Sequence, residues 1–449
     1  MTTLPANLSS RYDVVIIGSG VGGMCSAALL ANAGYRVLVA EKLQLLGGRF
    51  STHRFKDDYL LNTGGNVYCS NRYFYQVLQE VGLPQAPLLE PEIPLKYRFG
   101  GRDVIMPQRG GLKTIIREMA RSAEEAERVT SMVYDALQGN EPPDNLTLEE
   151  WIAQCTDNQL IRGFFWAIAA NLSSAGANEM PAGTAIHTMK NSPSFPYGWV
   201  KGGVITLHHM LASAIEGRGG AIVKGAKAVE ITASNGRVDG VVFDVEGRSV
   251  EVQAQVVISN IPPRDTVALV GEDRFAPEYL AEMRRTLRPA AGMEVIFVSE
   301  KKLFDFDGCI CFLPMVETRR LGQIEMMNQL DRSLSPPGVY YYLTLQIVEP
   351  GSHENVDREL ERRLVLEDLR EQVPEFEREC EVLTVRLYHK SRPIMNTIPG
   401  FVIDPQSPLP NLFFCGDASV PRGFSGSDGC ARNAQIVAGL IKERFAPAA

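Results

Sequence analysis

The chain has 449 residues, of which 45% are hydrophobic and 22% charged, and its net charge at pH 7 is -8. This length favours more than one domain, and no apolar run is long enough for a membrane-spanning helix. The acidic balance argues against a nucleic-acid partner, which usually shows as a basic excess. The N-terminal stretch MTTLPANLSSRYD lacks the pattern of a secretory signal, and eight cysteines are too few for a disulfide scaffold. We therefore expect a cytoplasmic protein with reduced thiols and, at most, peripheral membrane contact.

The first clear unit along the chain is YDVVIIGSGVGGMCSAALLANAGYRVLVAEK, residues 12–42. Residues 14–17 form the continuous apolar run of a buried parallel strand, and a helix rich in small residues follows. Residues 35–41 then form a second strand. This order predicts a right-handed βαβ unit and, with it, an α/β fold.

Three glycines and one acid within this unit predict a dinucleotide site. Gly18 allows a tight turn after the first strand, Gly20 lets a pyrophosphate approach the backbone, and Gly23 lets helix and strand pack closely. The N-terminus of the helix offers N–H groups and a partial positive charge to the phosphates. Glu41, about twenty residues further on, is suited to accept hydrogen bonds from a ribose. An acid at this position disfavours a 2′-phosphate and therefore NADP.

The segment KLQLLGGRFSTHRF, which follows Glu41 directly, favours FAD over NAD. The glycine pair Gly47-Gly48 and the cation of Arg49 would lie near the same pyrophosphate. Arginine suits a phosphate because its planar fork donates two hydrogen bonds. A nicotinamide enzyme has no need of this extension.

The middle of the chain reads as a mixture of helices and a hairpin. Residues 96–99 and 102–106 flank a Gly-Gly turn, and residues 112–136 have a charged helical pattern. Thr147 and Glu150 form a capping box that opens a further helix. The helix over 160–172 is apolar on most faces, as expected of an internal helix, although contact with a membrane or an apolar tunnel would give the same pattern.

Further strands recur at long intervals in the second half. A helix and three strands are expected within 202–260, and three more strands within 291–387. A helix over 355–373, which stops at Pro374, lies between the last two of these. This spacing indicates a separate mixed sheet, with the chain passing back and forth between two domains.

These motifs carry a family resemblance. From Val14 through GGRFST the sequence resembles the FAD-dependent amine oxidase and phytoene desaturase superfamily, and the resemblance extends to residues 197–231 and 411–441. The details VKGG and GSDGCARNAQ are closer to the phytoene desaturase branch. The resemblance implies a Rossmann-type FAD-binding domain interwoven with a substrate-binding domain that is built on a mixed β-sheet with helices. The first would comprise residues 1–73, 197–262 and 393–449, and the second residues 74–196 and 263–392.

The resemblance also implies which residues hold the FAD. The backbone of Val229 would contact the adenine, and Gly416 and Asp417 would lie beside the pyrophosphate and ribityl chain. The helix that follows the GFSGSDG loop would direct its N-terminus at the pyrimidine edge of the flavin. Further implied contacts are Lys42, Gly48, Arg49, Gly65, Asn66 and Val67. The chain departs from the family pattern at Asn62, where an Asp is usual.

The expected activity is hydride removal, to the flavin N5, from an apolar small molecule of isoprenoid or lipid-like kind. An amine or amino-acid oxidase, a flavin-dependent isomerase and a non-enzymatic lipid-binding escort protein of the same fold remain alternatives. No second nucleotide fingerprint is visible in the sequence, which favours oxygen or a quinone as electron acceptor.

Four residues are candidates for the chemistry. Tyr388, His389 and Arg392 precede the last flavin motif and could orient substrate or move a proton, and Lys201 could approach the flavin through water. The structural alternatives are that His389 is a satisfied structural histidine and that Arg392 forms a surface or interdomain ion pair. Tyr340 and Tyr342 share a strand face and could line a pocket or pack in the core. His208 and His209 lack partners at metal-ligand spacing, so no metal is expected.

Overall fold

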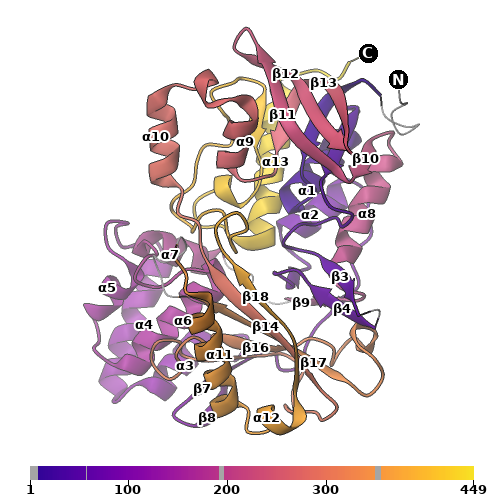
Figure 1. The fold of residues 1–449 in the computed structure, drawn as a ribbon. Helices are drawn as coiled ribbons and strands as arrows, with labels where there is room; N and C mark the ends of the chain where they lie inside the picture. The colour runs from indigo at the N-terminus through magenta and orange to yellow at the C-terminus, as the bar shows by residue number, and fades with distance from the viewer. Residues whose placement is uncertain (1–8, 57, 192–196, 349–354, 449) are drawn as a thin grey trace.

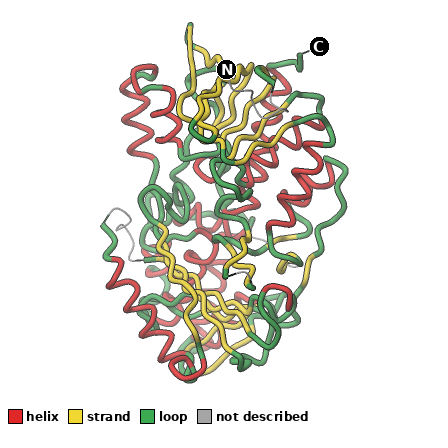
Figure 2. Tube along the Cα trace, turned by 45° about the vertical axis from the view of Figure 1, so that its right-hand side comes forward, coloured by secondary structure: helices red, strands yellow, loops and turns green. Residues whose placement is uncertain are grey.

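The computed structural model describes residues 9–56, 58–191, 197–348 and 355–448 and contains two seven-stranded sheets (Figure 1). One sheet lies in the upper half of Figure 1 and the other in the lower half, and the chain crosses between the halves several times. The tube view in Figure 2, turned by 45°, shows the same division. The first eight residues, on which part of the secretory argument rests, lie outside the described residues.

The upper sheet confirms the predicted βαβ unit. β1 pairs in parallel with β2 and with the C-terminal half of β13, while β11, β12 and β13 form an antiparallel meander. β19 comes from the far end of the chain and pairs in parallel with β13. The strands are β1 (Arg11–Ile17), β2 (Val37–Glu41), β10 (Ala221–Lys224), β11 (Ala226–Ser234), β12 (Arg237–Val245), β13 (Arg248–Ser259) and β19 (Leu412–Phe414).

Helices cover both faces of this sheet. α1 (Val21–Asn32), α8 (Ile205–Glu216) and α13 (Gly426–Arg444) share one apolar core with one face of β1 and β2. α9 (Pro263–Val270) and α10 (Pro277–Thr286) pack on the other face, with β11 and β12. Burial on both faces explains why residues 14–17 of β1 are all apolar.

The lower sheet is the mixed sheet expected from the second half of the chain. Its order is β18, β14, β17, β16, β15, β7, β8, and β15 is parallel to β7 while the other pairs are antiparallel. The strands are β7 (Leu95–Phe99), β8 (Arg102–Ile105), β14 (Gly292–Ser299), β15 (Cys309–Cys311), β16 (Gln323–Met326), β17 (Tyr340–Ile347) and β18 (Glu381–Tyr388).

α11 (Arg358–Gln372) covers one face of the lower sheet through Val365, Leu366 and Leu369. A bundle of helices packs against the end that contains β7 and β15. These helices are α3 (Gly111–Met119), α4 (Ala123–Leu137), α5 (Leu148–Ala153), α6 (Gln159–Ser173) and α7 (Ala182–Lys190). α2 (Tyr73–Glu80) lies beneath α1 in the upper half, and the short strands β3 (Thr52–Phe55), β4 (Tyr59–Asn62) and β9 (Tyr197–Val200) lie between the halves. β9 pairs with two further short strands, β5 (Tyr68–Cys69) and β6 (Leu88–Leu89).

Most of the local predictions are confirmed, but among the described residues the structure has four strands rather than three within 202–260 and five rather than three within 291–388. The Gly-Gly hairpin forms, and Thr147 and Glu150 make the capping box. The helical stretch over 112–136 is two helices, because Ser122 adopts an extended backbone and accepts a hydrogen bond from Glu125 as the cap of α4. α6 is buried along most of its length, as expected of an internal helix.

In the described part of the chain, none of the helices has the length and apolar character needed to cross a bilayer. The predicted domain boundaries stay a prediction, and the packing differs from them in two places. Residues 263–287 belong to the apolar core of the upper sheet, and α2 packs with α1 and α13.

Candidate flavin site

The glycine loop after β1 has the conformation that a nucleotide-binding turn needs. Gly18 has φ of +95°, which favours glycine, and its N–H donates to Ala40 O at 2.8 Å. A Cβ on Gly23 would lie 2.3 Å from Gly18 O, so only glycine lets α1 start this close to β1. No side chain caps the first turn of α1. The N–H groups of this turn therefore point into the loop without a side-chain acceptor.

The second glycine pair lies directly against this loop. Gly47 N donates to Ser19 O at 3.0 Å, and a Cβ on Gly48 would lie 3.7 Å from Gly20 Cα. Two stretches of backbone without side chains thus face each other. This cradle fits the pyrophosphate of a dinucleotide, which needs close access to backbone N–H groups.

Glu41 is buried and fixes the glycine loop from the end of β2. Its Oε2 accepts hydrogen bonds from Ser19 N at 3.0 Å and Ser19 Oγ at 2.7 Å, and its Oε1 accepts from Leu43 N at 2.9 Å. Oε2 accepts two hydrogen bonds, whereas Oε1 accepts one and retains a lone pair for a ribose hydroxyl. The neighbouring Lys42 is exposed to solvent.

The strand that carries Val229 is irregular at that residue. The pairing of β11 with β12 shifts between Ala228 and Glu230, so Val229 has no partner in the ladder, and 44% of the residue is exposed. β11 is an edge strand of the upper sheet. An edge strand with an unpaired residue has a backbone free for the adenine contact that the resemblance implies.

The two ends of the chain meet through an ion pair. Arg49 Nη2 lies 2.9 Å from Asp417 Oδ2, and Arg49 Nη1 donates to the carbonyls of Ile394 and Pro393. Asp417 also accepts from Asn396 N at 2.9 Å and Asn396 Nδ2 at 2.7 Å. Both Nη atoms of Arg49 thus bond to protein atoms, so its expected contact with phosphate stays a prediction.

Asn260 was missed by the sequence analysis although it lies at the centre of this arrangement. It follows the end of β13, and its Oδ1 lies 2.5 Å from the place where a Cβ on Gly20 would stand. Its Nδ2 donates to Cys415 O, the carbonyl that precedes Gly416. The side chain links the glycine loop to the C-terminal motif. Its position beyond the apolar strand AQVVIS, at the carboxyl edge of a parallel sheet, was the available signal.

The segment from Asn62 to Val67 connects the two halves. Asn62 Oδ1 accepts from Thr52 Oγ1 at 2.8 Å, which ties β4 to β3 at the position where the family usually has an Asp. Asn66 is buried and donates through Nδ2 to Glu325 Oε2, on β16 of the lower sheet, at 2.7 Å. Gly65 is exposed and Val67 half-buried. Their flavin contacts remain predictions.

Of the four candidates for the chemistry, Tyr388, His389 and Arg392 lie close to one another, whereas no contact joins Lys201 to them among the described residues. Tyr388 is buried, and its hydroxyl donates to Thr63 O at 2.9 Å. His389 and Arg392 form a tight turn through the bond from Arg392 N to His389 O, and the Arg392 side chain is exposed, with Cζ 5.9 Å from the Tyr388 ring centre. Lys201 is exposed in a turn after β9.

Tyr340 and Tyr342 on β17 pack against other side chains and do not line the candidate site. Tyr342 stacks on Phe297, with ring centres 5.1 Å apart, in the core beneath α11. Tyr340 lies under Arg332. His208, to which the sequence assigned no chemistry, is buried, and its Nε2 lies 2.8 Å from Phe50 O.

A buried polar cluster on the lower sheet was also missed. Glu294 on β14 and Glu325 on β16 are fully buried on the sheet face that looks toward β3, β4 and β9. Arg386 Nη1 donates to Glu294 Oε1 at 2.9 Å and also reaches Asn62 O. Burial raises the pKa of each glutamate to about 7. The sequence signal was a single acid in each of the apolar strands GMEVIFVS and QIEM, and an arginine inside the strand EVLTVRLY.

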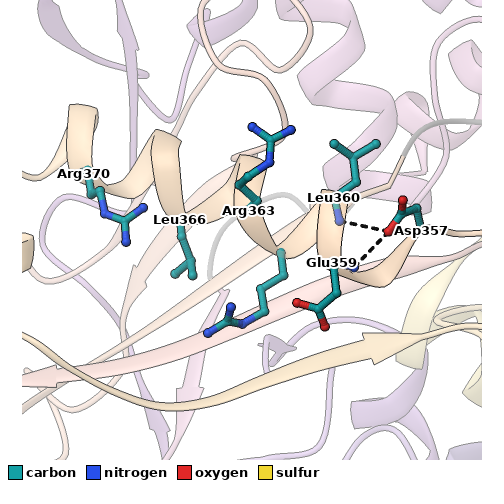
Figure 3. A pocket seen from close by; sticks show the side chains of 7 residues that line it. Asp357, Glu359, Leu360, Arg363, Leu366 and Arg370 are labelled. Carbon is teal, nitrogen blue, oxygen red and sulfur yellow. Dashed lines mark hydrogen bonds between the residues drawn. The ribbon is translucent and has the colours of Figure 1, made fainter.

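A hollow of about 570 Å³ on the surface of α11 is not part of this site (Figure 3). Its lining is mostly charged, and Asp357 there caps the helix by accepting from Glu359 N and Leu360 N. It shares no residue with the predicted FAD contacts.

Comparison with known proteins identifies the class to which this fold and site belong. The family model for flavin containing amine oxidoreductases matches residues 21–442, and the chain belongs to that family. FAD is therefore its cofactor, and oxidation–reduction is its class of chemistry.

Individual relatives match over shorter stretches or at lower identity. A phytoene desaturase from Fusarium fujikuroi is 38% identical over 72 residues, 16% of this chain and 12% of the relative. An amine oxidase [flavin-containing] B from Bos taurus is 34% identical over 94 residues, 21% of this chain and 18% of the relative. The crystal structure of an oxidoreductase from Methanosarcina mazei superposes with a TM-score of 0.83 at 25% identity, covering 95% of this chain and 99% of that one. The matched stretches thus span less than a fifth of the curated relatives' length.

Replacing Arg49 with alanine should loosen FAD about tenfold. The change leaves the buried carboxylate of Asp417 without its cation. The contact between the segment of Arg49 and the C-terminal motif is then no longer held in one geometry, which weakens FAD binding beside the glycine loop. Retention of FAD after dilution, followed by flavin fluorescence, measures the effect. Arg54→Ala, an arginine on the nearby β3, is the control. Equal retention in Arg49→Ala and the wild-type protein would contradict the role assigned to Arg49.

Proposed function

We propose that the protein is an FAD-dependent dehydrogenase whose substrate lies between the two halves, against the inner face of the lower sheet. When bound, FAD supplies the two-electron acceptor of the reaction. Gly18, Gly20, Gly23 and Gly48 would hold the pyrophosphate, and Glu41 the ribose. The remaining FAD contacts would come from Val229, the segment Gly65–Val67 and the pair Gly416 and Asp417.

One observation carries the location of the substrate. Gln323, Leu345 and Cys309 lie on central strands of the lower sheet, yet all three are only half-buried. α11 covers the other face, so the exposed parts of these three side chains lie on the face that carries Glu325 and looks toward β3, β4 and β9. The segment Gly65–Val67, predicted to contact FAD, reaches the same place through the bond from Asn66 to Glu325.

The substrate is best described as a small molecule with an apolar body and a polar or ionisable end. Half-buried apolar side chains near the open area, Leu172, Leu345 and Ile394, suit the apolar molecule expected from the sequence. Glu294 and Glu325 add a polar region in which Glu294 Oε2 has no hydrogen-bond partner among the described atoms, and a purely hydrocarbon substrate would supply none. The name of the phytoene desaturase relative favours dehydrogenation of a carbon chain.

Amine oxidation is the second candidate. Glu325 is a buried carboxylate with no ion pair among the described residues, and a substrate ammonium group would neutralise it. Isomerisation, in which hydride is removed and returned, would use the same site. The escort-protein alternative is not supported, because the chain belongs to a family of oxidoreductases.

An anaerobic screen for compounds that bleach the flavin tests the proposal. Bleaching by apolar alkenes or alcohols supports dehydrogenation, and bleaching by primary amines or amino acids supports the oxidase. Conversion of a substrate with no net reduction and no electron acceptor supports the isomerase. Purified protein that binds FAD but is not reduced by any of these compound classes would contradict the proposed function.

A further inference from the structure

The half-buried residues Gln323, Leu345 and Cys309, called the open area here, surround the buried Glu325 on the same face of the lower sheet. Glu325 is 3% exposed, and it points to the same face as Gln323 because the two are separated by one residue on β16. Gln323 Nε2 donates to Glu325 Oε1 at 2.6 Å, and Asn66 Nδ2 donates to Glu325 Oε2 at 2.7 Å. Both donors are neutral amides. The carboxyl group is thus held in one orientation without a neighbouring cation in an ion pair.

A second buried acid on the same face has an oxygen without a partner. Strand register sets Glu294 opposite Leu345 of β17 and Glu325 opposite Leu343, so both acids lie on one face. Glu294 Oε1 accepts from Arg386, but Oε2 has no hydrogen-bond partner among the described atoms although the residue is fully buried. Such an oxygen is costly unless a proton or a ligand donor completes it.

Charged and titratable groups from every neighbouring strand define how this cluster takes up protons. They are His53 on β3, Glu294 on β14, Cys309 on β15, Tyr341 on β17, and Arg386 and Tyr388 on β18. The hydrogen bond with Cys311, together with burial, raises the pKa of Cys309, and burial raises the pKa of both tyrosines, so these groups stay protonated at neutral pH. Burial likewise raises the pKa of Glu325 to about 7, and the Asn66 and Gln323 amides offset only part of that rise.

We propose that Glu325 is the group that accepts the substrate proton, an inference that rests on the proposed function. Dehydrogenation breaks two bonds to hydrogen on adjacent atoms. One hydrogen leaves with its electron pair as hydride to FAD, which is reduced. The other leaves as a proton to the Glu325 carboxylate, and its bonding pair becomes the second bond of the new double bond, so the substrate is oxidised. A base with a pKa near the working pH is best suited to this transfer.

Glu325 suits this role better than Glu294 for two geometric reasons. It adjoins the half-buried Gln323 and pairs in register with the half-buried Cys309, so it borders the area open to substrate. It is also bonded to Asn66, within the segment predicted to contact FAD. Glu294 instead holds Arg386, which ties β18 to Asn62, and acts as a positioning residue.

Glu325→Gln tests the proposal in the FAD-loaded protein, with Glu381→Gln, an exposed glutamate of the same sheet, as control. With any compound that bleaches the wild-type flavin, we expect the bleaching rate of Glu325→Gln to fall about 100-fold and to lose its inflection near pH 7. Glu325→Asp should keep an inflection at reduced rate. An unchanged rate and inflection in Glu325→Gln would overturn the proposal and leave the proposed function intact.

A second measurement needs no substrate. The pKa of Glu325 is higher in the folded protein than in the unfolded chain, so the folded state binds more protons between these values and stability falls as pH rises through them. Between pH 5 and pH 8 the ratio of the unfolding constants of wild type and Glu325→Gln should change on the order of 100-fold. A ratio that does not depend on pH would show that Glu325 does not titrate there, and would overturn the proposal even if no reducing compound is found.

Discussion

Replacing Gly23 with alanine should release FAD and lower the free energy of unfolding by about 3 kcal/mol. The added Cβ would lie 2.3 Å from Gly18 O and 3.2 Å from Asn260 Cβ. Gly18 O belongs to the backbone of the loop, so the clash cannot be relieved by rotating a side chain. α1 would have to move away from β1, and the first turn of the helix would no longer face the pyrophosphate.

The matched control is Gly439→Ala in α13, where an added Cβ meets nothing within 4 Å. Because alanine favours a helix interior over glycine, this variant should be as stable as the wild type or more so, by up to about 1 kcal/mol. Urea unfolding and the flavin absorbance of the purified variants measure both effects. Gly23→Ala protein that keeps its FAD and its urea midpoint would contradict the geometry of the loop.

Replacing Glu41 with alanine should weaken FAD binding about 100-fold. The change removes the acceptor for Ser19 N, Ser19 Oγ and Leu43 N, all in or beside the glycine loop, together with the expected ribose contact. A hydrogen bond to a charged group contributes about 1.5–3 kcal/mol, so one lost ribose contact and a loosened loop account for this factor.

Titration of the apoprotein with FAD measures the dissociation constant directly. Glu41→Gln keeps the shape and one acceptor oxygen and should lie between the wild type and Glu41→Ala. Glu251→Ala, an exposed glutamate on β13 of the same sheet, should bind FAD as the wild type does. Wild-type affinity in Glu41→Ala would rule out the ribose contact.

The parts of the site that lie close together in sequence could be predicted, and the physical reason is clear. The turn at Gly18, the approach at Gly20 and the acid at Glu41 belong to one βαβ unit, whose geometry follows from its own residues. Asn260 and Arg49 could not be placed in the same way. Their partners, Cys415 and Asp417, lie more than a hundred residues away, and only the pairing of β19 with β13 brings them together.

In the lower half, too, the sequence alone could not predict which residues lie together at the site of the chemistry. The expectation of an apolar substrate came from the resemblance to the phytoene desaturase branch, and hydropathy could not add the polar groups, since it records how much of a segment is buried but not which face it lines. Glu294 and Glu325 stand in different apolar strands, and only the sheet register puts them on one face with Tyr388 and Arg386. The single acids in those strands were the signal, but the strand order was needed to interpret it.

The central claim is that the two ends of the chain enclose one FAD. Hydrogen–deuterium exchange of the apoprotein, before and after addition of FAD, tests it most directly. We predict that FAD slows exchange in residues 18–23 and in residues 411–429 together, with the same dependence on FAD concentration. Protection confined to one of these two segments would contradict the claim.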